Sequence, residues 1–148
     1  MVDVREDILA RLLEVVAAIP NIRSAYRNNT EIAENQLPAV IVFDGDEETS
    51  DTQNRPSNSP IIVQMTPEII IAEQSDEVGS DLTTLRRELI KLVLFDTELN
   101  NLIAQSSPRG NGAIRYLGCQ TDLGWMRSLH GALRAQFMFK YTLRPEQL

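Results

Sequence analysis

The stretch Leu133-Arg134-Ala135-Gln136-Phe137-Met138-Phe139-Lys140-Tyr141-Thr142 decides the fold, because apolar side chains occupy every second position. A helix would spread its aromatic side chains around its circumference, whereas a strand places them in one row. The alternation therefore predicts a half-buried β-strand that continues to Leu143. The residues expected to face the core are Leu133, Ala135, Phe137, Phe139 and Tyr141, and those expected to face outward are Arg134, Gln136, Met138, Lys140 and Thr142.

A second extended stretch, residues 114–120, precedes this strand, and the two together predict a hairpin. Its connection, residues 122–131, holds the only Trp and the only His of the chain. Trp125, Met126 and Arg127 are of types that are enriched in protein interfaces. They predict a contact with a partner; alternatively, Trp125 folds back over the sheet as a lid.

The rest of the chain alternates between helical spacing and short β-branched runs. Asp3 and the pair Asp96-Thr97 stand where helix N-caps belong, and Pro20 ends the first helix. The predicted helices are residues 3–19, a helix that begins at Ser80 or Asp81, and residues 98–104. The predicted strands are residues 24–27, 37–43 and 61–72, in addition to the hairpin.

Pro67 interrupts the apolar run of residues 61–72, which is therefore either one long strand with a bulge or two short ones. Its continuous apolar character predicts cover on both faces, with the second cover supplied by a neighbouring subunit. Because the strands come in runs, we expect a single α+β domain over residues 1–148, with helices on one face of an antiparallel or mixed sheet. We expect the tail, residues 144–148, to be frayed.

Residues 44–60 consist of acidic, polar, Gly and Pro residues, and they predict a long exposed loop that orders on assembly. Within it, Asp46, Glu47, Glu48 and Arg55 are candidate interface residues. Asp44, Asp46 and Glu48 also match the first positions of a calcium loop. However, Thr49 stands where that loop needs Gly, and Arg55 where it needs Glu. The acidic residues are therefore best interpreted as a solvated rim.

The net charge of −7 is unevenly distributed. Residues 109–148 hold six basic and two acidic side chains, a net of +4, so the first 108 residues carry −11. An acidic protein is a poor general binder of the DNA backbone, but a charge-polarised one can stack on copies of itself. The acidic N-terminus and the lack of a long apolar run predict no signal peptide, no membrane contact and synthesis in the cytoplasm.

Cys119, Asp122 and His130 lie close together in the sequence and suggest a cysteine-dependent hydrolase. A small buried cysteine in a strand and a histidine in a turn explain the same residues more simply. No phosphate-binding loop, paired His or cysteine cluster accompanies them. The sequence therefore predicts no cofactor, no metal and no enzymatic activity.

Several segments resemble tail terminator (tail completion) proteins of long-tailed bacteriophages, and the resemblance covers almost the whole chain. It lies in the overall layout of the chain, since none of these segments is a catalytic motif. The segments are Ala18-Ile19-Pro20, Ala25-Tyr26-Arg27-Asn28, residues 37–47, Leu85-Arg86-Arg87-Glu88-Leu89 and residues 114–122.

The resemblance implies a structural virion protein without enzymatic activity. Such proteins form a ring, typically of six subunits, on the head-proximal end of the tail tube, where they stop polymerisation and form the head-joining surface. The implied partners are copies of the chain itself, the tail tube protein and the head–tail connector, and DNA passes through the pore without specific binding. A connector or neck protein on the portal side is the alternative within the same assembly.

Overall fold

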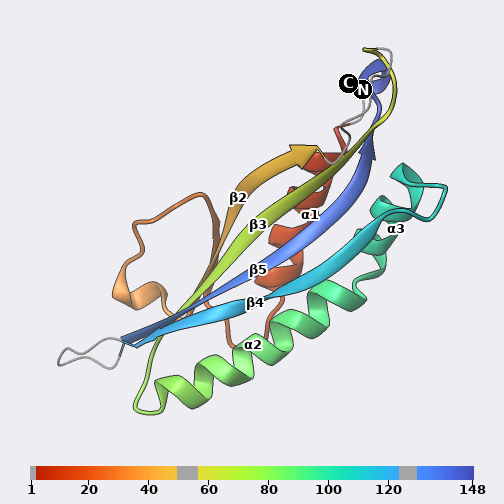
Figure 1. The fold of residues 1–148 in the computed structure, drawn as a ribbon. Helices are drawn as coiled ribbons and strands as arrows, with labels where there is room; N and C mark the ends of the chain where they lie inside the picture. The colour runs from red at the N-terminus through yellow and green to blue at the C-terminus, as the bar shows by residue number, and fades with distance from the viewer. Residues whose placement is uncertain (1–2, 50–56, 124–129) are drawn as a thin grey trace.

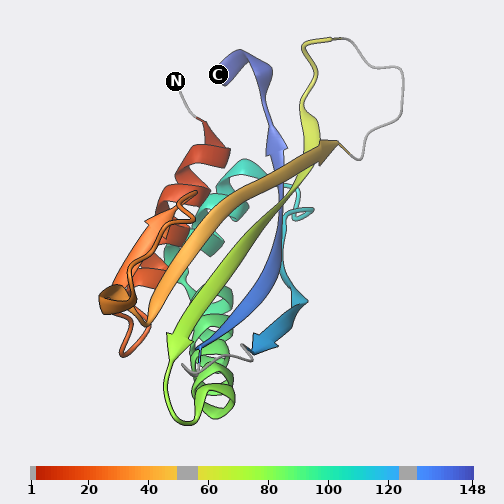
Figure 2. The same cartoon turned by 90° about the vertical axis from the view of Figure 1, so that its left-hand side faces the viewer.

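A computed structural model describes residues 3–49, 57–123 and 130–148. Five strands form one mixed sheet in the order β1-β2-β3-β5-β4, and three α-helices cover one face of it (Figures 1 and 2). The predicted single α+β domain with helices on one face is confirmed. The elements are α1 Val4–Ala17, β1 Ser24–Arg27, β2 Ala39–Thr49, β3 Ile61–Gln74, α2 Val78–Phe95, α3 Thr97–Ser106, β4 Ala113–Leu123 and β5 His130–Leu143.

The core lies between the sheet and the three helices. Its largest fully buried side chains include Phe137, Phe139 and Tyr141 from β5, so the predicted aromatic row does face the core. Two residues that were predicted to face outward, Met138 and Thr142, are also buried. Thr142 lies within 3.3 Å of the Ser107 hydroxyl, because the segment after α3 covers the end of β5.

The helix caps follow the sequence closely. The Asp3 side chain accepts a hydrogen bond from the Glu6 amide at 3.4 Å, and the Asp96 side chain accepts one from the Leu99 amide at 2.9 Å. The second helix begins at Val78, earlier than predicted, because tertiary contact extends it. Val78 is buried, and its side chain packs so closely on Gly131 that a Cβ there would approach within 2.7 Å.

β3 is one uninterrupted strand, and the bulge lies opposite it, in β2. The register moves from Phe43↔Glu68 to Asp46↔Thr66, so two residues of β2 face Pro67 alone. Pro67 has no amide hydrogen to donate, so β3 has no unpaired amide at this position. Only one face of β3 is fully buried and the other is half-buried, so the predicted complete cover of both faces is not present within the chain.

The predicted loop 44–60 is wrong in its first third. β2 continues to Thr49, because its backbone pairs with residues 63–66 of β3 although its side chains are polar. The hairpin strands are likewise longer than predicted, ending at Leu123 and restarting at His130. In the tail, which was predicted to be frayed, residues Pro145–Gln147 form a short 3-10 helix, and the Gln147 amide donates to the Arg144 carbonyl at 2.9 Å.

Candidate interaction surface

The acidic end of β2 presents its side chains to two different faces of the sheet. Asp46 and Glu48 lie opposite Thr66 and Gln64 on the outer face, and both are exposed. Glu47 points to the helix-covered side, where it accepts a hydrogen bond from the buried hydroxyl of Tyr141. The pKa of Tyr141 is raised well above its usual range, first by burial and then by this hydrogen bond. All three acidic residues of the predicted solvated rim are exposed, and Glu47 is in addition hydrogen-bonded to Tyr141.

Arg27 anchors β2 at the residues where its acidic end begins. Arg27 of β1 donates to both oxygens of Asp44, at 2.8 and 3.1 Å, and to both oxygens of Glu6, at 2.7 and 2.9 Å. Hydrogen bonds from Arg27 lower the pKa of both carboxyl groups. Arg5 also donates to the Gly45 carbonyl at 3.3 Å. The N-terminal turn of α1 thus holds β1 and the bulge of β2 in place.

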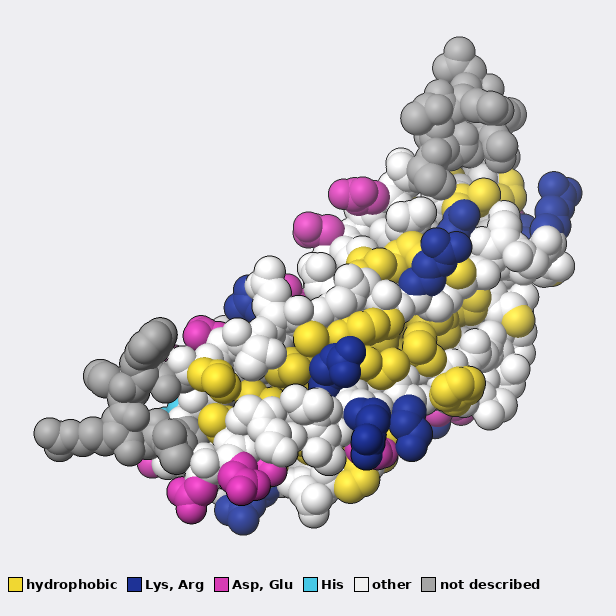
Figure 3. All heavy atoms as spheres, turned by 60° about the horizontal axis from the view of Figure 1, so that its bottom comes forward, with side chains coloured by type: hydrophobic (Ala, Val, Ile, Leu, Met, Phe, Trp, Pro, Cys, Tyr) yellow, Lys and Arg dark blue, Asp and Glu magenta, His cyan; other side chains and the backbone are white. Residues whose placement is uncertain are grey.

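At the opposite edge of the sheet, β4 and β5 carry basic side chains. Arg115 of β4 is exposed and Lys140 of β5 is half-exposed, and neither side chain pairs with an acidic group within the described parts of the chain. Arg134, farther along β5, does have a partner, since it lies 3.2 Å from Glu68. Figure 3, which brings the side of α2 and β4 forward, shows Lys and Arg side chains spaced along a band of apolar surface. The distal end of β2 is therefore acidic, whereas β4 and β5 carry basic side chains at Arg115 and Lys140 that are unpaired among the described residues.

Apolar side chains accompany the basic ones at this edge. Leu117 and Leu123 of β4 are 52% and 45% exposed. Leu117 lies at the rim of a shallow hollow on the outer face, whose other walls include Glu68, Arg134 and Gln136. An edge that combines exposed leucines with unpaired basic groups has the composition of a contact surface.

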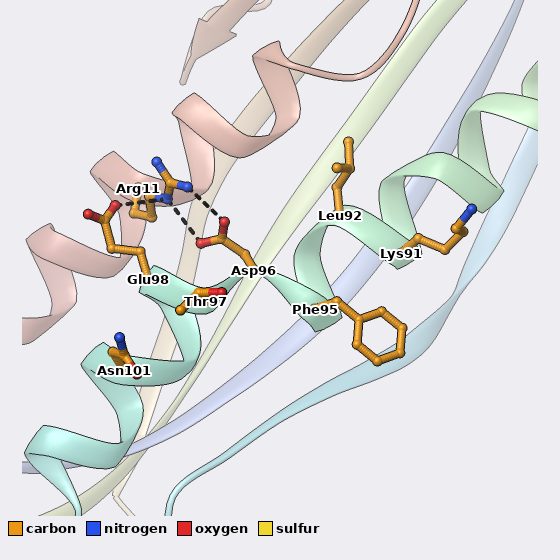
Figure 4. A pocket seen from close by; sticks show the side chains of 8 residues that line it. All are labelled: Arg11, Lys91, Leu92, Phe95, Asp96, Thr97, Glu98 and Asn101. Atoms are coloured by element: carbon orange, nitrogen blue, oxygen red, sulfur yellow. Dashed lines mark hydrogen bonds and ion pairs between the residues drawn. The ribbon is translucent and has the colours of Figure 1, made fainter.

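A second apolar feature lies where α2 meets α3. Phe95 is 81% exposed and points away from α1, beside Lys91 (Figure 4). The turn itself is fixed, because Arg11 of α1 holds both oxygens of Asp96 at 2.7 and 3.0 Å. The same hydrogen bonds lower the pKa of Asp96. Phe95 was not predicted as a site residue. Two features of the sequence could have indicated its exposure: it precedes the capping Asp96, and it lies outside the apolar stripe of α2.

A cysteine-dependent hydrolase needs a histidine close to its cysteine, and the structure does not bring His130 near Cys119. Cys119 is exposed and pairs in register with Ala135, five residues from His130, a separation of about 17 Å along β5. The His130 ring lies 3.4 Å from Glu34, and Cys119 lies on the side of Arg86 and Tyr116. The predicted burial of Cys119 is wrong, because Cys119 is exposed in β4, the edge strand of the sheet.

The calcium loop, which the sequence already disfavours, also lacks a free first ligand, since Arg27 engages both oxygens of Asp44. Across residues 3–49, 57–123 and 130–148, no cluster of three metal-binding side chains is found. Four predicted interface residues, Arg55, Trp125, Met126 and Arg127, lie outside the described residues. Their predicted role in partner contact stays a prediction.

No protein-family model and no curated protein sequence matches the chain. None of the helices in the described ranges combines the length and the hydropathy needed to cross a bilayer.

Proposed function

We propose that this protein is a tail terminator of long-tailed bacteriophages, a structural protein that caps the head-proximal end of the tail tube as a ring. The proposal is supported by where the segments that resemble this family lie in the fold. Residues 37–47 supply most of β2, and residues 114–122 supply most of β4. β4 is an edge strand of the sheet, and β2 is open on one side beyond Ala39–Val42, where β1 pairs with it, so other subunits have access to both strands.

In this role the protein does no chemistry. Copies close into a ring, one face of the ring stops tube growth, and the other face receives the head–tail connector. The excess of acidic groups in the first 108 residues suits a channel for DNA, because like charge disfavours contact with phosphates. The protein would then reside in the virion, after synthesis in the host cytoplasm.

The test is a capping assay with purified tail tubes. Light scattering gives the mass of the protein alone and after mixing, and electron microscopy shows where it binds. The proposal predicts density at one end of each tube and no further growth when tube protein is added. Protein that ignores the tubes but binds the head vertex supports the connector alternative, and protein that binds neither contradicts both functions.

A further inference from the structure

Besides the short edge strand β1, two strand edges of the sheet are open among the described residues. β1 pairs with β2 only at Ala39–Val42, so the edge of β2 beyond the bulge has β3 on one side and no strand on the other. The pairing of β1 with β2 ends at Asn28, whose side chain accepts a hydrogen bond from the Asp44 amide at 3.1 Å. On the opposite side of the sheet, β4 pairs with β5 alone. An open edge presents unpaired amide and carbonyl groups that can accept another strand.

Each open edge contains a regular span of similar length. Asp46–Thr49 pairs with β3 without a register shift, and Ala113–Tyr116 pairs with β5 without one. Each span is about 13 Å long, so the two match in length. The bulges at Gly45 and Gly118 lie outside these spans and do not prevent a strand from adding to them.

The two spans carry opposite charge. The β2 span carries Asp46 and Glu48 on the outer face, and the β4 span carries Arg115, with Lys140 beside it opposite Ala113. Like charges directly opposite one another destabilise paired strands. Pairing of two β2 spans, or of two β4 spans, is therefore disfavoured, whereas pairing of β2 with β4 is favoured.

We propose that the β2 span of one copy adds to the β4 span of a second copy, with Asp46 and Glu48 facing Arg115 and Lys140. The inference rests on the proposed function, since it names the contact that would build the ring. Because the two spans lie on opposite sides of one sheet, the contact is heterologous and each copy offers one free span of each kind. Repetition of such a contact forms either a closed ring or an open filament.

The experiment reverses the charge of each span and then of both. The acidic-span variant is Asp46→Lys with Glu48→Lys, the basic-span variant is Arg115→Glu with Lys140→Glu, and the combined variant carries all four changes. Self-association is measured by sedimentation at low salt over a range of concentrations, and circular dichroism checks that each variant is folded. Glu31→Lys with Asp76→Lys is the control, since both residues are exposed and the net charge changes by the same amount as in the acidic-span variant.

Each single-span variant should weaken self-association at least about tenfold, whereas the control should not. The combined variant, which has the net charge of the wild type, should associate with itself again but not with the wild type. Added salt should weaken the wild-type contact, because ions screen exposed charges. A combined variant that stays dissociated, single-span variants that associate normally, or a wild type that is monomeric at millimolar concentration would overturn the inference.

The capping assay separates this inference from the proposed function. If wild-type protein caps tubes and the single-span variants cap equally well, the strand contact is wrong although the function stands. If the combined variant restores association but neither it nor the wild type caps tubes, the contact stands and the function is wrong.

Discussion

β5 and the distal end of β2 are both strands, but their sequences are opposite in character. β5 places five successive alternate side chains in the core, and its alternation alone predicts a strand. Residues 44–49 of β2 are acidic and polar, and they were predicted to be a loop. Apolar alternation therefore identifies only those strands that bury one face. A polar segment without such alternation can also form a strand where a neighbouring backbone supplies its hydrogen bonds.

The largest expected effect is the difference between what the two strands contribute to the free energy of unfolding. Phe137→Ala in β5 should reduce the free energy of unfolding by about 3–5 kcal/mol, because it opens a cavity in a fully buried site. Glu48→Ala in β2 should change it by less than about 0.5 kcal/mol, because the side chain is exposed. Urea denaturation measures both. Equal losses would show that the polar end of β2 contributes to stability as a core strand does.

The bulge of β2 should be the most sensitive point of that strand. Gly45 has φ of 72°, and a Cβ there would lie 2.1 Å from the Thr66 carbonyl oxygen. Gly45→Ala should therefore cost about 2–3 kcal/mol of stability, through strain and a shifted backbone. Gly110→Ala is the matched control, since Gly110 has φ of 78° but open space around it, and should cost about 1 kcal/mol. Similar costs for the two variants would contradict the close approach at the bulge.

Removal of the arginine that anchors β2 should have a smaller effect, which depends on pH. Arg27 lowers the pKa of Glu6 and Asp44, and a group whose pKa is lower in the folded state stabilises the fold above its unfolded pKa. That stabilisation is lost as the pH falls through the folded pKa.

Arg27→Met should therefore cost about 1 kcal/mol at pH 7, a value kept low because Glu6 is 55% exposed and water screens the pair. The difference from the wild type should shrink as the solution is acidified below about pH 4. Denaturation at several pH values measures it, with Arg87→Met as the exposed control. A cost that is constant with pH would mean that packing of the Arg27 stem, and not its charge, anchors β2.

An effect of similar size is expected from the hydrogen bond between Glu47 of β2 and Tyr141 of β5. Tyr141→Phe removes the donor to Glu47 and should cost about 1 kcal/mol at pH 7. The folded-state pKa of Tyr141 is raised, so its contribution is present below the unfolded pKa and is lost as the pH rises above about 10. The variant should lose less stability than the wild type between pH 9 and 11. An identical alkaline loss in both proteins would contradict this.

The sequence predicted the elements that have a buried face. The caps at Asp3 and Asp96, the helical stripes and the core row of β5 depend on local spacing, which is visible in one chain. The candidate surface was less predictable, because it depends on which strands become neighbours. That Glu47 reaches Tyr141, 94 positions away, and that Cys119 and His130 separate along the hairpin, follow from strand register alone.

The exposure of Phe95 was missed for a related reason. Its position at the end of α2 is compatible with burial against a following element, and only the turn fixed by Arg11 and Asp96 directs it to solvent. The charge separation, by contrast, was visible as a difference between the two parts of the sequence. The fold then places those parts on opposite sides of one sheet.

The most direct test of the account is covalent trapping of the contact between copies. Glu48→Cys and Arg115→Cys are introduced together in a Cys119→Ser background, and the protein is oxidised in the presence of tail tubes. The account predicts a ladder of cross-linked species that ends at the ring, with no ladder from either single cysteine variant. Dimers from Glu48→Cys alone, with no ladder from the pair, would show that β2 contacts β2 and would contradict the account.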